Sequence, residues 1–221
     1  MNDTAPEHDP FRKARLILDL RQSGLTDHAL LKAVEQVPRD VFVPTDVSEY
    51  AYDDVALPIA CGQTISRPTT VAGMVNALEL GEKREYTVLE IGTGSGYMAA
   101  LIAKLARRIY TVDRYRTLVE GARLRFEDLG LFNVITQCSD GAKGWPETAP
   151  FDRIVSTCAL EAPPQTWVDQ LKPGGLLVMP IGTNEEQYVI VIRKSQDGAL
   201  TEQRLAPSKF LHLAEGIAKQ L

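Results

Sequence analysis

The chain has 221 residues, of which 24 are Lys or Arg and 29 are Asp or Glu, so its formal net charge is −5. A hydrophobic content of 44% and a charged content of 24% exclude an intrinsically disordered chain. The acidic balance argues against nucleic acid as the main partner, because phosphate binding requires a basic face. The length predicts one large domain, or one domain with an appendage.

The ends and the cysteines indicate the compartment. Residues 1–10 are polar and acidic, which predicts a mobile tail and not a signal peptide. Cys61, Cys138 and Cys158 cannot all pair and show no C-x-x-C spacing, which argues against a disulfide framework and a zinc site. The longest apolar stretch, 98–106, is too short to cross a bilayer. We therefore expect a cytoplasmic protein with no metal and no membrane partner.

Two helices are predicted first. Apolar spacing predicts a helix over 11–23 that Gly24 ends, and a second that Thr26 or Asp27 caps and Pro38 ends. A long irregular segment, 42–58, follows; such loops are often functional.

From residue 86 onward, short apolar strands alternate with helices, which predicts right-handed crossovers and a mostly parallel sheet. The expected strands are 87–91, 109–113, 133–137, 154–155 and 176–180, and the expected helices are 97–107 and 116–129. The last two strands, 188–193 and 200–205, flank a turn at 195–198 and predict an antiparallel hairpin. The fold class is therefore α/β, a doubly wound sheet with helices on both faces and an N-terminal helical extension.

A glycine-rich loop joins the first of these strands to its helix, with glycines at Gly92, Gly94 and Gly96. Glycines let the backbone approach a ligand, and the helix N-terminus offers free N–H groups. Tyr97 stands where a dinucleotide fingerprint has its third glycine. Glu90 would repel a pyrophosphate but attract a cationic ligand such as a sulfonium amino acid.

Two acids follow the next two strands. Asp113 ends its strand, where a carboxylate can accept hydrogen bonds from ribose hydroxyls, and Asp140-Gly141 lies where an adenine amino group would bind. We expect these residues to meet the glycine loop in one crevice. The alternatives are a tight strand–helix link for the glycines, a helix N-cap for Asp113 and a simple turn for Asp140-Gly141.

These features resemble the S-adenosylmethionine site of the Rossmann-like methyltransferases. The resemblance implies a set of cofactor-binding residues: Glu90, Gly92, Thr93, Gly94, Ser95, Gly96, Asp113, Asp140 and Gly141.

The segment before the sheet contains a second motif, a polar loop over 58–68 that leads into a predicted helix over 70–80. Ser66, Thr69 and Thr70 either cap this helix or form a site for a substrate carboxylate. Gly62-Gln63-Thr64-Ile65-Ser66 with Pro68 resembles the signature loop of the protein-L-isoaspartate (D-aspartate) O-methyltransferases. The likeness covers 12–213 and includes further matching segments: 37–39, 42–44, 52–53, 56–58, 144–146, 150–152, 171–175 and 180–182.

That family transfers a methyl group from S-adenosylmethionine to the α-carboxyl of L-isoaspartyl and D-aspartyl residues in damaged proteins and releases S-adenosylhomocysteine. The methyl ester then cyclises unaided to a succinimide. The resemblance implies that Ser66 is the active-site residue, that Thr64 and Ile65 flank the donor methyl, and that Gln187 lies near the cofactor. We expect Ser66 to align the substrate carboxylate and not to act as a nucleophile. A carboxylate is already ionised at neutral pH, so His8, His28 and His212 are interpreted as surface or tail residues.

Three departures from the family pattern leave the substrate open: Arg67, Met98 and the stretch 156–161. Arg67 either pairs with a substrate carboxylate or acidic flank, or is a solvated charge. The alternatives are a methyltransferase of the same build with another substrate, and a non-catalytic cofactor-binding protein. We expect residues 1–80 to form the substrate segment, residues 81–221 to form the cofactor-binding domain, and the chain to be a monomer.

Overall fold

The computed structural model describes residues 10–218, so the predicted tail lies outside the described residues except for Pro10. The helices are α1 (Pro10–Gln22), α2 (His28–Gln36), α3 (Pro68–Ala77), α4 (Tyr97–Leu105), α5 (Arg116–Asp128) and α6 (Gln165–Asp169). The strands are β1 (Leu57–Pro58), β2 (Thr64–Ile65), β3 (Thr87–Ile91), β4 (Arg108–Asp113), β5 (Val134–Cys138), β6 (Phe151–Ser156), β7 (Leu171–Gly182), β8 (Gln187–Lys194) and β9 (Leu200–Ser208). Four short 3₁₀ helices are η1 (Arg39–Phe42), η2 (Thr45–Tyr50), η3 (Ala60–Gly62) and η4 (Gly141–Lys143).

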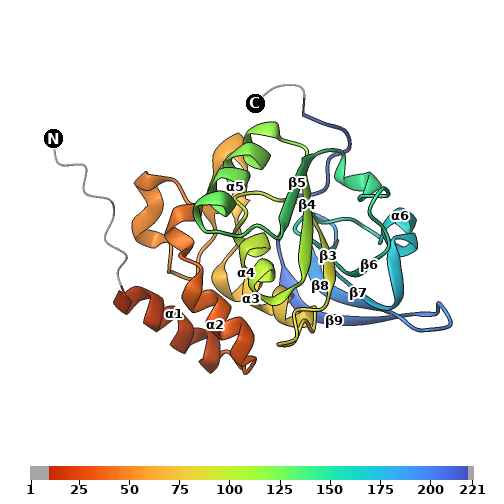
Figure 1. Cartoon of the computed structure of the whole chain (residues 1–221), viewed down its shortest axis with the longest axis horizontal. Coiled ribbons are helices and arrows are strands. Elements are labelled where there is room, and N and C mark those ends of the chain that lie inside the picture. The colour runs from red at the N-terminus through yellow and green to blue at the C-terminus, as the bar shows by residue number, and fades with distance from the viewer. Residues whose placement is uncertain (1–9, 219–221) are drawn as a thin grey trace.

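The main sheet has seven strands in the order β5-β4-β3-β6-β7-β8-β9 (Figure 1). The pairings from β5 across to β7 are parallel, and β8 and β9 extend the sheet as antiparallel neighbours. This confirms the predicted fold class, a mostly parallel sheet that ends in a hairpin. The strand order reverses beside β3, which places a crevice at the carboxyl end of that strand.

Alternate residues of the central strands belong to two apolar clusters. Val88 and Val155 pack into a cluster with α1 to α5, whereas Leu89 and Ile154 pack into one with Trp167 of α6. The first cluster also contains residues from α1, α2 and α3, so the N-terminal segment packs on the sheet. Figure 1 shows α1 to α5 on one side of the sheet and α6 on the other.

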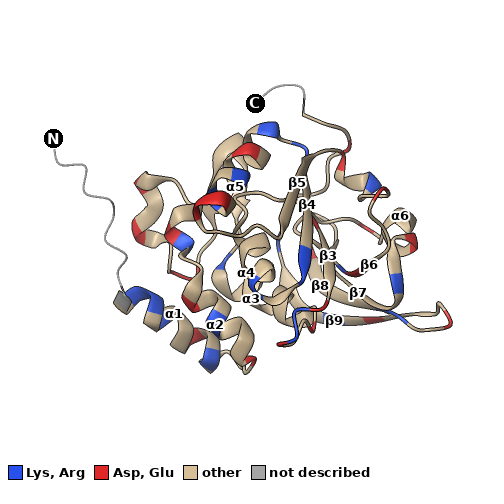
Figure 2. Ribbon diagram, viewed as in Figure 1, with Lys and Arg blue, Asp and Glu red and all other residues tan. Residues whose placement is uncertain are grey.

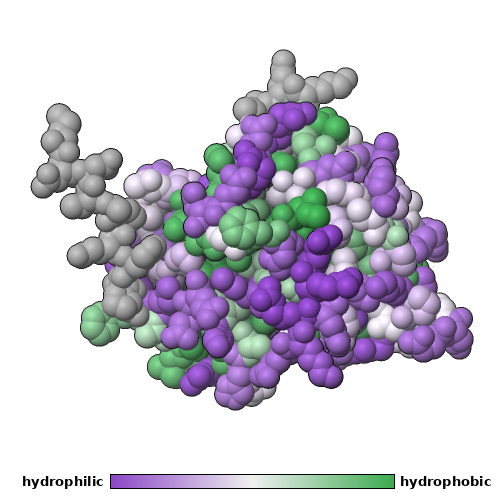
Figure 3. Space-filling model, viewed as in Figure 1, coloured by the Kyte–Doolittle hydropathy of each residue, from purple (hydrophilic) through white to green (hydrophobic). Residues whose placement is uncertain are grey.

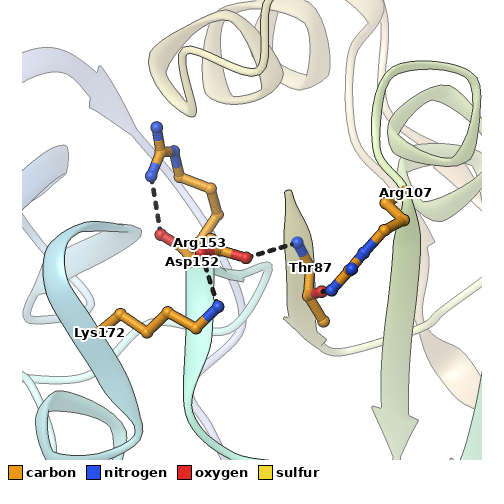
Figure 4. Close-up of polar contacts among 5 residues, drawn as sticks. All are labelled: Thr87, Arg107, Asp152, Arg153 and Lys172. Atoms are coloured by element: carbon orange, nitrogen blue, oxygen red, sulfur yellow. Dashed lines mark hydrogen bonds and ion pairs between the residues drawn. The ribbon is translucent and has the colours of Figure 1, made fainter. Parts of the chain in front are cut away.

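A polar cluster ties together the amino ends of β3, β6 and β7 (Figure 4). The carboxylate of Asp152 accepts hydrogen bonds from the Thr87 backbone N–H and the Lys172 ammonium, both at 2.8 Å. Arg153 donates to the backbone carbonyl of Asp152 at 2.9 Å, and Arg107 donates to the Thr87 hydroxyl at 3.0 Å. The cluster fixes the amino ends of these strands, at the end of the sheet opposite the crevice.

One of the two predicted helix caps is confirmed and the other is wrong. Asp27 caps α2 as predicted, by accepting from the Leu30 N–H at 2.9 Å. The capping alternative for Ser66, Thr69 and Thr70 is wrong, because α3 starts two residues earlier and has no cap from its own N-cap side chain. A distant acid, Asp54, accepts from the Thr69 N–H instead, at 3.0 Å.

Other element boundaries also differ from the prediction. The segment 42–58 contains η2 and β1, and the strand predicted over 176–180 is part of the longer β7. Helix α6 has only five residues, too few to show a period in the sequence.

The described surface is mixed in charge. Figure 2 shows both acidic and basic residues on α1 and α5, and Figure 3 shows a mainly hydrophilic face with small groups of apolar atoms. Large apolar side chains are exposed on or beside these helices, including Phe11 and Phe132. Within residues 10–218 no helix combines the length and the apolar character needed to cross a membrane.

Candidate active site

A cavity of about 610 Å³ opens at the carboxyl ends of β3, β4 and β6. Ten predicted site residues line it: Thr64, Ile65, Ser66, Glu90, Gly92, Thr93, Gly94, Ser95, Asp113 and Gly141. The volume lies within the range typical of small-molecule sites. The two predicted motifs, separated by the whole of α3, therefore meet in one space.

Three predicted site residues do not line this cavity: Gly96, Asp140 and Gln187. Gly96 is needed for packing, because a Cβ there would lie 2.8 Å from the Phe126 ring of α5. The Asp140 carboxylate accepts from the Ala142 N–H at 3.0 Å and caps η4. Gln187 bonds both the N–H and the carbonyl of Phe210, at 2.7 and 3.1 Å, and so supports a cavity wall.

Backbone hydrogen bonds fix the glycine loop. The N–H groups of Gly92 and Thr93 both donate to the Val112 carbonyl, at 2.9 and 3.0 Å. Gly92 has φ 93°, and a Cβ there would lie 2.2 Å from the Thr157 hydroxyl oxygen. Only glycine fits between the two strand ends at this point, as a tight strand–helix link requires, and the loop also lines the cavity.

Asp113 connects the glycine loop to the end of β4. Its Oδ2 accepts from the Gly94 N–H at 2.9 Å, and its Oδ1 accepts from the Tyr115 N–H at 3.0 Å. The N-cap alternative is wrong, because Tyr115 is the N-cap residue of α5. Burial raises the pKa of Asp113, and the two N–H groups act in the opposite direction. Each carboxylate oxygen keeps a lone pair for a ligand hydroxyl in the cavity.

Glu90 is fully buried at the floor of the cavity. Its Oε2 accepts from the Thr111 hydroxyl, whereas its Oε1 has no hydrogen-bond partner among the described residues. Burial raises the pKa of Glu90 to about 8, so the carboxyl is mostly protonated at neutral pH. A ligand cation against Oε1 would favour ionisation and satisfy this oxygen.

The Glu90 carboxyl makes stability depend on pH. The unfolded chain ionises near 4.5 and the native state near 8, so between these values the native state holds the extra proton and stability falls as pH rises. We expect this carboxyl to lower the free energy of unfolding by about 2 kcal/mol between pH 6 and pH 8. Urea unfolding should show this loss in the wild-type protein and not in Glu90→Gln. An equal loss in both proteins would contradict the assignment.

Arg39 holds the Ser66 loop from beneath, a contact that the sequence did not predict. Its side chain is fully buried and donates to the carbonyls of Ala51 at 2.8 Å and Ser66 at 2.7 Å. The guanidinium carbon lies 4.7 Å from the centre of the Tyr97 ring. One side chain thus joins the N-terminal segment, the Ser66 loop and the first residue of α4.

The chain end forms a further wall that sequence reasoning missed. Residues 208–214 line the cavity, and the Leu213 N–H donates to the Ala159 carbonyl at 2.9 Å. His212, interpreted as a surface residue, lies in this wall with its Nε2 3.4 Å from the Gln187 amide nitrogen. His212 is half-buried there. No periodicity marks this segment, and its pairing with residue 159 places it beside the cavity.

One of the three cysteines, Cys158, lines the cavity. Burial raises the pKa of its thiol to about 12. Its sulfur therefore stays protonated at neutral pH, as expected for a packing residue. Among residues 10–218, no group of three or more His, Cys, Asp or Glu side chains is arranged to hold a metal ion.

Comparisons with known proteins show which family the chain resembles. Residues 11–218 match the family model described as protein-L-isoaspartate(D-aspartate) O-methyltransferase. Proteins named protein-L-isoaspartate O-methyltransferase from Parvibaculum lavamentivorans and Rhodospirillum rubrum are 47% and 46% identical, over 99% and 94% of this chain and 98% and 95% of theirs. A solved structure of a protein with the same name superposes with a TM-score of 0.82 at 29% identity, over 93% of this chain and 67% of that one. The chain therefore belongs to the protein-L-isoaspartate(D-aspartate) O-methyltransferase family.

Proposed function

We propose that this protein transfers a methyl group from S-adenosylmethionine to the α-carboxyl of L-isoaspartyl residues in damaged proteins, releasing S-adenosylhomocysteine. Full-length similarity to proteins named protein-L-isoaspartate O-methyltransferase supports this function. The observation that carries the proposal is that Ser66 lines the same cavity as Glu90 and Asp113. A site for a substrate carboxylate therefore adjoins a site for a cationic cofactor.

The described residues fit the cofactor. The unpartnered Oε1 of Glu90 suits a cationic group, and the carboxylate of Asp113 suits the hydroxyls of a ribose. The backbone of the glycine loop and the wall formed by 208–214 would enclose the rest. When bound, S-adenosylmethionine supplies the electrophilic methyl group.

Ser66 has the role of positioning the substrate. A carboxylate near its ordinary pKa of about 4 is ionised at neutral pH, so the reaction needs no general base. The Ser66 hydroxyl donates to one carboxylate oxygen and leaves the other free to face the methyl group. The 2.7 Å bond from Arg39 to the Ser66 carbonyl keeps this hydroxyl in place. Such positioning contributes up to roughly 7–11 kcal/mol to an otherwise bimolecular reaction.

A peptide pair tests the function. We expect methyl transfer from radiolabelled S-adenosylmethionine to an isoaspartyl peptide and none to the same peptide with normal aspartate. A D-aspartyl version tests the second substrate of the family. Labelling of none of these, with cofactor binding still seen by calorimetry, would instead support another substrate or a non-catalytic role.

Ser66→Ala is expected to lower turnover about 30-fold, because a hydrogen bond to a charged group contributes about 1.5–3 kcal/mol. Cofactor affinity should not change, since the backbone that faces the cofactor remains. Steady-state kinetics with an isoaspartyl peptide and calorimetry with S-adenosylhomocysteine measure the two effects. Full turnover in the variant would eliminate this role for Ser66.

We also propose that residues 1–80 and 81–221 work as one compact unit, as a monomer in the cytoplasm. Burial of Leu31 and Val34 in the same cluster as Val88 supports the single unit. Three free cysteines favour a reducing compartment.

A further inference from the structure

A second cavity, of about 350 Å³, lies beside the first. Its walls come from the end of α1, from α3, and from β8 and β9, through residues such as Leu20, Thr69, Val189 and Pro207. Arg67 and Thr70 line both cavities. The two spaces therefore meet at the residue that follows Ser66.

Arg67 is the one charged residue among those that line the second cavity in the described chain. Its side chain is exposed, and residues 10–218 provide it with no hydrogen bond or ion pair. The nearby Asp54 does not pair with Arg67; both of its carboxylate oxygens accept hydrogen bonds from Thr69 in the first turn of α3. The guanidinium is therefore available to a ligand.

The backbone of Arg67 is held firmly. It is the N-cap residue of α3 and precedes Pro68, whose ring fixes the start of the helix. The preceding carbonyl, that of Ser66, is bonded to the buried Arg39. The Arg67 side chain therefore starts from a backbone that is fixed next to Ser66.

We propose that the second cavity receives the peptide side chain next to the isoaspartyl residue, and that Arg67 makes an acidic side chain the preferred one. A planar guanidinium binds a carboxylate through two parallel hydrogen bonds, whereas a neutral or basic side chain leaves it unpaired or repels it. The remaining walls are apolar or carry hydroxyl or amide groups, so no other charge competes. This inference rests on the proposed function and specifies its substrate class.

Isoaspartyl peptides that carry Glu, Gln or Lys immediately before or immediately after the isoaspartyl residue test the proposal. We expect kcat/KM for Glu to exceed that for Gln about fivefold at one of the two positions, with Lys lower still. The difference should lie in KM and weaken at high salt, because the pair is partly exposed. Arg67→Gln should bring the Glu and Gln values within twofold of each other. Lys83→Gln, which removes one exposed cation before β3 at the far edge of the sheet, should keep the fivefold preference.

Equal kcat/KM for Glu and Gln at both positions in the wild-type protein would overturn the proposal, as would a preference that survives Arg67→Gln. A preference for an apolar neighbour over Glu would also overturn it and would identify the second cavity as an apolar subsite. Failure of the proposed function looks different. In that case no isoaspartyl peptide is methylated, whatever its neighbours.

Discussion

Gly92→Ala is expected to lower the affinity for S-adenosylmethionine about 10³-fold. The new Cβ would lie 2.2 Å from the Thr157 hydroxyl oxygen and 3.2 Å from the Cys158 sulfur, on a backbone with φ 93°. The strained backbone costs about 1–2 kcal/mol. Moving Thr157 aside also breaks its 2.8 Å hydrogen bond to the Gly92 carbonyl, which costs about 1 kcal/mol more, before the displacement of the cavity wall is counted.

Calorimetric titration with S-adenosylhomocysteine measures this loss, and two variants isolate its cause. Adding Thr157→Ala removes the nearest atom and should restore about tenfold of the affinity, because only the strain at φ 93° and the contact with Cys158 remain. Gly198→Ala has a similar φ of 88° with nothing within 4 Å, so it should leave cofactor affinity unchanged. Equal losses for Gly92→Ala with and without Thr157→Ala would show that the collision is not the cause.

The predictable part of the site is the part set by local sequence. A strand followed by glycines and a helix can be recognised from the local sequence alone, and so can an acid at a strand end. Gly92, Gly94 and Asp113 were therefore predicted correctly as cavity residues. The rule that parallel strands end at a common edge brought them together.

The predicted site residues that do not line the cavity have contacts set by long-range packing. Gly96 has the spacing of a ligand-binding glycine, yet its missing Cβ makes room for Phe126, thirty positions along the chain. Gln187 was predicted to lie near the cofactor. Its amide donates a hydrogen bond to Phe210, which belongs to a chain segment without any periodic pattern. Sequence spacing does not distinguish a residue that touches the ligand from one that supports its wall.

Arg39 is the clearest case of a residue that only the tertiary structure explains, and Arg39→Met is expected to lower the free energy of unfolding by about 3–5 kcal/mol. Methionine retains much of the apolar stem but leaves the buried Ala51 carbonyl and the part-buried Ser66 carbonyl without their donors. It also removes the cation over Tyr97. Turnover should also fall about tenfold in the fraction that remains folded, because the Ser66 loop loses its anchor. Urea unfolding and kinetics with an isoaspartyl peptide measure the two effects.

Arg153, which Figure 4 shows beside Asp152, provides a matched control, because its contacts are of the same kind as those of Arg39. It is also buried, its guanidinium lies 4.0 Å from the centre of the Tyr86 ring, and it donates to the Leu78 carbonyl at 2.6 Å and the Asp152 carbonyl at 2.9 Å. Arg153→Met should therefore lose similar stability and keep its turnover once the unfolded fraction is subtracted. Arg39→Lys, which retains the charge but not the fork of donors, should recover part of both losses. If Arg39→Met and Arg153→Met lowered turnover equally, Arg39 would be a structural residue alone, and the position of Ser66 would have to depend on the loop itself.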